Sequence, residues 1–219
     1  MDIHRYFTFV FIMFILSFTN VSSQNNMEIK VNQALLPVAE KYKSNIAVDA
    51  ADYNLVYYLK DKIRDTAVHI YRFESGGKMG SITYNAPHIT VIVDEKGILK
   101  GFSHLGAKMK GENNLAEQRC KQLALSFFSR YASDLTDVNY QWVDDQTFPI
   151  VINRTKSNLR AKWVKYRDRK TGYYLWVILA PDGSIMEFDR DIYWNFLRGG
   201  RVNELWLRDD WFEKRMKRR

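Results

Sequence analysis

Two stretches of this chain are nearly the same strand–turn–strand phrase, and this repetition constrains the fold more than any other feature. Residues 91–102 read VIVDEKGILKGF and residues 177–188 read VILAPDGSIMEF, without a gap and 86 positions apart (177 − 91 = 86). In each phrase an apolar run leads into a turn that contains a glycine, Gly97 or Gly183, and a second run returns. Glycine tolerates the positive φ that closes such turns. We therefore predict two β-hairpins, with Gly97 and Gly183 as structural turn residues.

Weaker echoes keep the same order in both halves of the chain. QALL at residues 33–36 matches QLAL at 122–125, and KYKS at 41–44 matches RYAS at 130–133. A period of this length is typical of a duplicated unit rather than a short-period solenoid. We therefore expect an α+β protein of two similar modules, each an amphipathic helix packed on an antiparallel sheet, followed by a C-terminal extension.

The helix is clearest in the second copy. From Cys120 to Tyr131 the apolar residues recur at intervals of three and four, which predicts one apolar helix face. Asn114, followed three residues later by Glu117, predicts a capping box at the helix start. In the first copy, Pro37 lies inside the expected helix and should shorten or kink it.

The strands of the second copy follow its helix. The run YYLWVIL at 173–179 is apolar on both faces, which predicts a central strand. Pro149 interrupts the run at 148–152 and predicts an edge strand or a break, because proline cannot donate to a ladder.

The N-terminal residues have the three-part layout of a secretory signal peptide. Arg5 precedes the apolar stretch 6–18, and small polar residues follow up to Gln24. The apolar stretch is shorter than the roughly 20 residues that a membrane span needs. We therefore predict a signal peptide at residues 1–23 and a protein exported to the periplasm or secreted. An uncleaved membrane anchor is the alternative.

These features define five segments of the chain. They are the signal peptide (1–23), the first module (24–105), a linker (106–114), the second module (115–192) and a basic aromatic extension (193–219). The net charge is +8, and half of that excess lies between residues 198 and 219. Because the protein is expected outside the cytoplasm, nucleic acid is not an expected partner, and a membrane is one only through an uncleaved signal segment.

No catalytic or metal-binding pattern is visible in the sequence. Cys120 is the only cysteine, so no internal disulfide forms, and its place on the apolar helix face indicates a core residue. His69, His88 and His104 have spacings that match no short metal motif. We therefore predict a protein that is not an enzyme, with no catalytic residues, no metal and no cofactor.

The aromatic residues leave one question open. Trp163 and Trp176 are expected to pack the helix onto the sheet. A second group lies among arginines near the C-terminus and is either core or a protein-binding surface, since such residues dominate interfaces. This candidate interface consists of Tyr193, Trp194, Arg198, Trp206 and Trp211.

The repeated unit, a helix and then strands that end in TGYYLWVILAPDGSIMEF at 171–188, resembles the PepSY domain of exported bacterial proteins. The resemblance covers Val31 to His104 and Leu115 to Ile192, as two tandem copies. It implies a non-catalytic activity, namely binding and often inhibiting a protein outside the cytoplasm. The helix-on-sheet layout is also cystatin-like, and such a fold can instead hold a small ligand.

The function expected from the sequence is therefore binding or inhibition of another protein in the periplasm or at the cell surface. One version is an immunity-type protein that blocks a delivered toxin. The alternative is a binder of a small ligand or of the envelope surface, which would use the concave face of the sheet.

Overall fold

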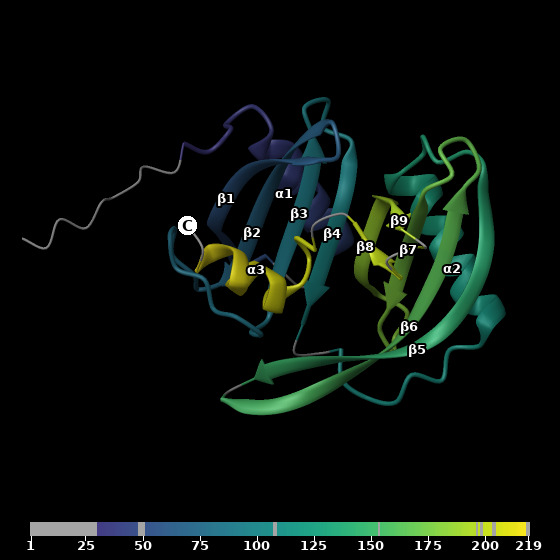
Figure 1. The fold of residues 1–219 in the computed structure, drawn as a ribbon. Helices are drawn as coiled ribbons and strands as arrows, with labels where there is room; N and C mark the ends of the chain where they lie inside the picture. The colour runs from purple at the N-terminus through teal and green to yellow at the C-terminus, as the bar shows by residue number, and fades with distance from the viewer. Residues whose placement is uncertain are drawn as a thin grey trace, which may run out of the picture.

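The computed structural model describes residues 30–47, 51–106, 109–152, 154–195, 197, 199–202 and 205–217 of the 219-residue chain (Figure 1). The signal-peptide prediction at 1–23 lies outside these residues. In chain order the elements are α1 (Leu36–Ile46), β1 (Tyr53–Ile63), β2 (Thr66–Ser75), β3 (His88–Asp94), β4 (Leu99–Leu105), α2 (Glu117–Tyr131), β5 (Val138–Ile152), β6 (Thr155–Asp168), β7 (Tyr174–Leu179), β8 (Ile185–Ile192), β9 (Trp194–Asn195), β10 (Gly200–Arg201) and α3 (Asp209–Met216).

The two repeated hairpins, β3–β4 and β7–β8, lie side by side in the middle of one sheet. Their second strands, β4 and β8, pair antiparallel, and Phe102 lies opposite Phe188. These phenylalanines hold the same position in the repeated phrase (188 − 102 = 86), so the pairing register is symmetric about them. The resulting strand order is β1-β2-β3-β4-β8-β7-β6-β5. The first half of the chain therefore forms one side of the sheet and the second half the other (Figure 1).

The prediction of two separate helix-on-sheet modules is wrong, because one eight-stranded antiparallel sheet runs through both halves. As two isolated four-stranded sheets, the halves would expose the backbone N–H and C=O groups of β4 and β8 along an edge. Pairing the two strands satisfies those groups. A small second sheet contains only β9 and β10.

Helices α1 and α2 cover the same face of the large sheet. Ala39 of α1 and Phe127 of α2 belong to one buried cluster, which also contains Phe102 and Phe188. This cluster spans both halves of the chain, so the two helices do not define separate cores.

Gly97 and Gly183 lie in the turns of the repeated hairpins, with φ of 77° and 86°. A Cβ at Gly97 would lie 3.3 Å from Cγ1 of Val38 in α1, and one at Gly183 would lie 3.1 Å from Cδ1 of Leu123 in α2. Both glycines therefore supply positive φ and also let a helix approach the turn closely.

The helix starts differ in part from the sequence predictions. Pro37 lies in the first turn of α1, where its missing N–H removes no helical hydrogen bond, so the helix begins there and is shorter than α2. The capping box at Asn114 and Glu117 is wrong, since the N-cap of α2 is Ala116 and makes no side-chain hydrogen bond. Asn113 instead donates from Nδ2 to the carbonyl oxygen of Leu179 at 2.9 Å and so connects the start of α2 to β7.

Two strands in the second half of the chain, β7 and β5, lie where the sequence predicts a central strand at 173–179 and an edge strand or a break at 148–152. β7 lies between β8 and β6, where the apolar run at 173–179 predicts a central strand. Pro149 is exposed and lies in β5, the last strand of the sheet, where its missing N–H is tolerated.

The C-terminal segment 205–217 covers the first half of the sheet on the face opposite α1 (Figure 1). Trp206, Leu207 and Phe212 form a buried cluster with residues of β1, β2 and β3. Gly101 in β4 provides room for this segment, because a Cβ there would lie 3.4 Å from Cδ1 of Leu207 and 3.0 Å from Cδ1 of Ile92. This part of the extension therefore belongs to the fold.

The long β5–β6 hairpin extends beyond the sheet toward the first half of the chain (Figure 1). Near its tip, the backbone N–H of Val151 donates to the carbonyl oxygen of Asn85 at 2.6 Å. Phe148, Ile150 and other residues of this hairpin form a third buried cluster with the face of β7 that is turned away from α2. Among the described helices, none has the length and apolar character needed to cross a membrane.

Candidate functional site

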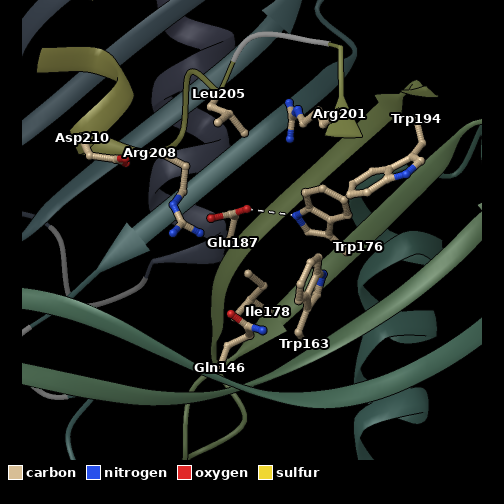
Figure 2. Close-up of a pocket in the computed structure, with 10 residues that line it drawn as sticks. All are labelled: Gln146, Trp163, Trp176, Ile178, Glu187, Trp194, Arg201, Leu205, Arg208 and Asp210. Atoms are coloured by element: carbon tan, nitrogen blue, oxygen red, sulfur yellow. Dashed lines mark hydrogen bonds between the residues drawn. The ribbon is translucent and has the colours of Figure 1, made fainter. Parts of the chain in front are cut away.

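A cavity of about 270 Å³ opens in front of β7 and β8, on the sheet face opposite α2 (Figure 2). Trp176 and Ile178 of β7 line it because successive strand residues point to opposite faces, and their neighbours Leu175 and Val177 face the helices. Glu187 reaches the same cavity from β8. We call this cavity the tryptophan pocket.

Two other parts of the chain form the walls of the tryptophan pocket (Figure 2). Trp163 contributes from β6, and its ring lies edge-to-face against Trp176, with 5.1 Å between centroids. The C-terminal part of the chain contributes Trp194, Arg201 and Arg208. Three indole rings held by strands thus line one side of a cavity whose volume is large enough for a small ring-shaped molecule.

Glu187 is the central polar group of the tryptophan pocket. It is 5% exposed, and its Oε1 accepts a hydrogen bond of 2.9 Å from Nε1 of Trp176. Burial, together with the nearby Asp189 carboxylate, raises the pKa of Glu187 to about 7, although Arg208, the Trp176 hydrogen bond and Arg201 oppose the shift. Glu187 can therefore exist as a neutral acid near neutral pH, when it can donate as well as accept a hydrogen bond.

Asp189 and Arg201 form a pair beside the tryptophan pocket. Nη1 of Arg201 lies 2.5 Å from Oδ2 of Asp189, and its guanidinium carbon lies 5.5 Å from the ring centroid of Trp176. Burial raises the pKa of Asp189, and the contact with Arg201 opposes that shift. The positive charge of Arg201 is therefore already matched by a carboxylate of the protein.

A second cavity of about 280 Å³ adjoins the tryptophan pocket and shares Glu187, Arg208 and Asp210 with it. We call it the serine pocket, because Ser103 of β4 lines it with a hydroxyl that is buried and has no hydrogen-bond partner among the described residues. Phe148 of β5 forms part of its wall, and the guanidinium carbon of Arg208 lies 5.0 Å from the Phe148 ring centroid.

A buried ion pair holds the C-terminal wall of both cavities against the sheet. Arg72 of β2 is 1% exposed and donates to both carboxylate oxygens of Asp209, at 3.2 Å for the Nη2–Oδ2 contact. Its Nε donates to Glu74 at 2.8 Å. Since Asp209 stands between Arg208 and Asp210 in sequence, this ion pair positions two residues that line the cavities.

The described residues of the candidate interface do not form one surface. Trp206 is buried, and Trp211 packs on it at 4.2 Å between ring centroids. Trp194 lines the tryptophan pocket, whereas Tyr193 is 46% exposed and lies beside Tyr173 and Arg64. Arg198 lies outside the described residues.

His88 and His104 lie near one another on the neighbouring strands β3 and β4, whereas His69 lies on β2. Nδ1 of His69 is 2.8 Å from the hydroxyl of Tyr58, Nδ1 of His88 donates to the carbonyl oxygen of Ala86 at 2.8 Å, and His104 lies edge-on to Tyr53. In the described part of the chain, no group of three or more His, Cys, Asp or Glu side chains is arranged to hold a metal ion. Cys120 is a free thiol, buried in the cluster beneath α2.

Of the candidate binding residues predicted from the sequence, Trp194 lines the tryptophan pocket, and the other residues that make the site were missed. Trp163 and Trp176 were expected to pack a helix onto the sheet, but they lie on the other face. The alternation of side chains along a strand could have indicated the face on which these tryptophans lie, because their neighbours Val164 and Val177 face α2. The signal for Glu187 was a charged residue inside the repeated phrase, at the position that Gly101 holds in the first copy (187 − 101 = 86).

Comparison of the chain with protein-family models, with curated proteins and with solved structures finds no match, so the resemblance to the PepSY family stays a prediction and the function is argued from the geometry of the site.

Proposed function

We propose that this protein binds a small molecule with a flat, largely apolar ring in the tryptophan pocket. The observation that carries the proposal is an open cavity of about 270 Å³ that is lined by Trp163, Trp176 and Trp194, with the buried carboxyl group of Glu187 beside them. Aromatic rings provide flat apolar contact area, and one or two fixed polar groups orient the bound molecule.

A binding role is favoured over a catalytic one by the groups near the two cavities. The hydroxyl of Ser103 has no hydrogen-bond partner among the described residues, so no base is in place to activate it. His88 uses Nδ1 to bond Ala86, and its Nε2 lies 3.8 Å from Asp209, which is beyond hydrogen-bond distance. This arrangement lacks the contact between nucleophile and base that acyl transfer needs.

The proposal includes export, on the ground of the signal-peptide layout at residues 1–23. N-terminal sequencing of the protein recovered from producing cells tests this part. A mature chain that starts at Gln24 is expected, and a chain that still starts at Met1 in the cytoplasmic fraction would contradict export.

The experiment for the binding role is a thermal-shift screen of the purified protein against a library of small aromatic and alicyclic compounds. Compounds that stabilise the wild type are then titrated against Trp163→Ala, which removes one wall of the pocket. Trp142→Ala is the matched control, because Trp142 also contacts Trp163 edge-to-face, at 4.9 Å between centroids, but does not line the cavity. Loss of binding in both variants, or in neither, would count against the tryptophan pocket as the site.

A second candidate function, association with another protein outside the cytoplasm, is favoured by the β9–β10 hairpin. Tyr193, Leu197 and Val202 are 46%, 100% and 58% exposed there, and exposed apolar groups of this kind are typical of protein contacts. A photo-crosslinker at Leu197, used in the producing cell, tests this candidate. A specific crosslinked partner that disappears with Val202→Asp is expected, whereas crosslinks unaffected by that change would oppose it.

A further inference from the structure

We propose that the bound molecule is an anion, with its ring in the tryptophan pocket and a carboxylate in the serine pocket beside Arg208 and Ser103. This inference rests on the proposed function and specifies the chemistry of the ligand. It follows from the distribution of charge and of hydrogen-bonding groups around the two connected cavities.

Arg208 is the cation at this site that is free to bind a ligand. Its guanidinium group lines both cavities and forms no ion pair with any described residue. The two other arginines nearby are already matched, since Arg201 binds Asp189 and Arg72 binds Asp209 and Glu74. The charge of Arg208 acts on the nearby carboxyl group of Glu187, but no described carboxylate is in ion-pair contact with it. A half-buried guanidinium without such a direct contact favours a ligand that supplies a carboxylate.

The tryptophan rings are poorly suited to a positively charged ligand, because cations of the protein already lie against them. Nζ of Lys165 lies 5.4 Å from the ring centroid of Trp194, and it is also close to Trp142 and Tyr174, at 5.2 and 4.1 Å. Arg201 lies 5.5 Å from the Trp176 ring centroid. A further cation would be repelled by Lys165 and would compete with Arg201 for the Trp176 ring, whereas a neutral ring would not be repelled.

Three carboxyl groups line the cavities and have to be weighed against an anionic ligand: Glu187, Asp209 and Asp210. Asp209 is neutralised by its ion pair with Arg72. Asp210 is exposed, so water screens its charge. Glu187 is buried and faces Trp176 and Ile178 of β7, Ser103 of β4, Asp189 of its own strand and the guanidinium groups of Arg201 and Arg208. With a pKa of about 7, Glu187 takes up a proton in mildly acidic solution, and its negative charge then no longer opposes an anionic ligand.

The serine pocket supplies the second polar contact. Ser103 is 1% exposed, and its hydroxyl has no hydrogen-bond partner among the described residues, although it can donate one bond to a carboxylate. Buried hydroxyl groups are rarely left unsatisfied, so this group indicates where a polar part of the ligand binds.

Three probes with the same ring and chain but different charge test the inference: phenylbutyrate, phenylbutanol and phenylbutylamine. Binding is measured by the change in tryptophan fluorescence at low salt and below pH 7. We expect the carboxylate to bind about tenfold more tightly than the alcohol, since a hydrogen bond to a charged group contributes more than a neutral one. The amine is expected to bind most weakly.

Substitutions at Arg208 and Ser103 test whether these residues cause the preference for the carboxylate probe. Arg208→Gln should weaken binding of the carboxylate about tenfold more than binding of the alcohol and so remove the preference for the carboxylate, and Arg208→Lys should restore part of that preference. Ser103→Ala should weaken carboxylate binding about threefold. Arg160→Gln is the matched control, because the Arg160 side chain is 62% exposed and pairs with Glu112 away from the cavities.

The outcomes separate the inference from the proposed function. If the amine or the alcohol binds as tightly as the carboxylate, the inference is wrong and the small-molecule site stands. The same holds if Arg208→Gln and Arg160→Gln have equal effects. If none of the three probes binds and the library screen also gives no ligand, the proposed function fails and the inference fails with it.

Discussion

Glu187 and His88 are buried ionisable residues that act in opposite directions on how stability changes with pH. In the folded protein the pKa of Glu187 is raised from 4.5 to about 7, so the stability linked to its neutral form is present below pH 4.5 and is lost as the pH rises through 7. The pKa of His88 is lowered from 6.5 to about 4 by burial and by the charge of Arg72. Its contribution is therefore present above pH 6.5 and is lost as the pH falls through 4.

Glu187→Gln removes the first of these contributions and keeps an oxygen that can accept the Trp176 hydrogen bond. We expect the free energy of unfolding of the variant to rise relative to the wild type by about 3 kcal/mol between pH 4.5 and pH 7, since one pKa unit corresponds to about 1.4 kcal/mol. Urea denaturation at several pH values measures it. Glu117→Gln is the control. Lys121 and Tyr140 lower the pKa of the exposed Glu117, so the free energy of unfolding of this variant should fall relative to the wild type as the pH rises.

His88→Gln removes the second contribution and retains a donor for the carbonyl oxygen of Ala86. Relative to the wild type, the free energy of unfolding of this variant should rise by about 3 kcal/mol as the pH falls from 6.5 to 4. The same denaturation series measures it. A difference that does not change with pH would mean that His88 titrates normally in the folded protein.

Among the elements, α3 depends most on a single contact, the ion pair between Arg72 and Asp209. Asp209→Asn leaves the buried guanidinium of Arg72 with only part of its partners, and breaking one side of such a pair costs about 3–5 kcal/mol. We expect that loss of stability, together with a red shift of tryptophan emission as Trp206 and Trp211 become exposed. Both are measured in one urea titration that follows fluorescence.

The neighbouring residue provides the control for this prediction. Asp210→Asn changes an exposed carboxylate that makes no ion pair with a described residue, so its effect on stability should be below about 0.5 kcal/mol. Equal effects of the two substitutions would show that α3 is held by its apolar contacts alone.

At the scale of single elements, the sequence predicts the structures that depend on residues close together in the chain. The hairpins at Gly97 and Gly183 follow from turn chemistry, and α2 follows from its apolar period. The contact that holds α3 joins residues 137 positions apart, and no local pattern indicates it. Likewise, the tryptophan pocket is the volume left between the sheet and segments that are distant in sequence, so Trp163, Trp176 and Glu187 were recognisable as strand residues but not as parts of one site.

In the whole molecule, the pairing of β4 with β8 converts two copies of one phrase into a single sheet. The repeat was visible in the sequence, but the partner of each second strand was not, because two exposed edges can either stay apart or pair. The apolar cluster under α1 and α2 then crosses the junction through Phe102 and Phe188. This arrangement makes the two halves depend on each other.

We therefore expect the described part of the chain to unfold as one unit, with equal free energies of global opening for amides of β2 and of β7 in native-state hydrogen exchange. Phe102→Ala removes a fully buried ring at the junction and should lower both values by about 3–5 kcal/mol. Leu125→Ala, at a residue that is 48% exposed on α2, is the control and should leave both within about 0.5 kcal/mol of the wild type. If Phe102→Ala lowers the values in β2 but not in β7, the halves are independent and the shared sheet is not a cooperative unit.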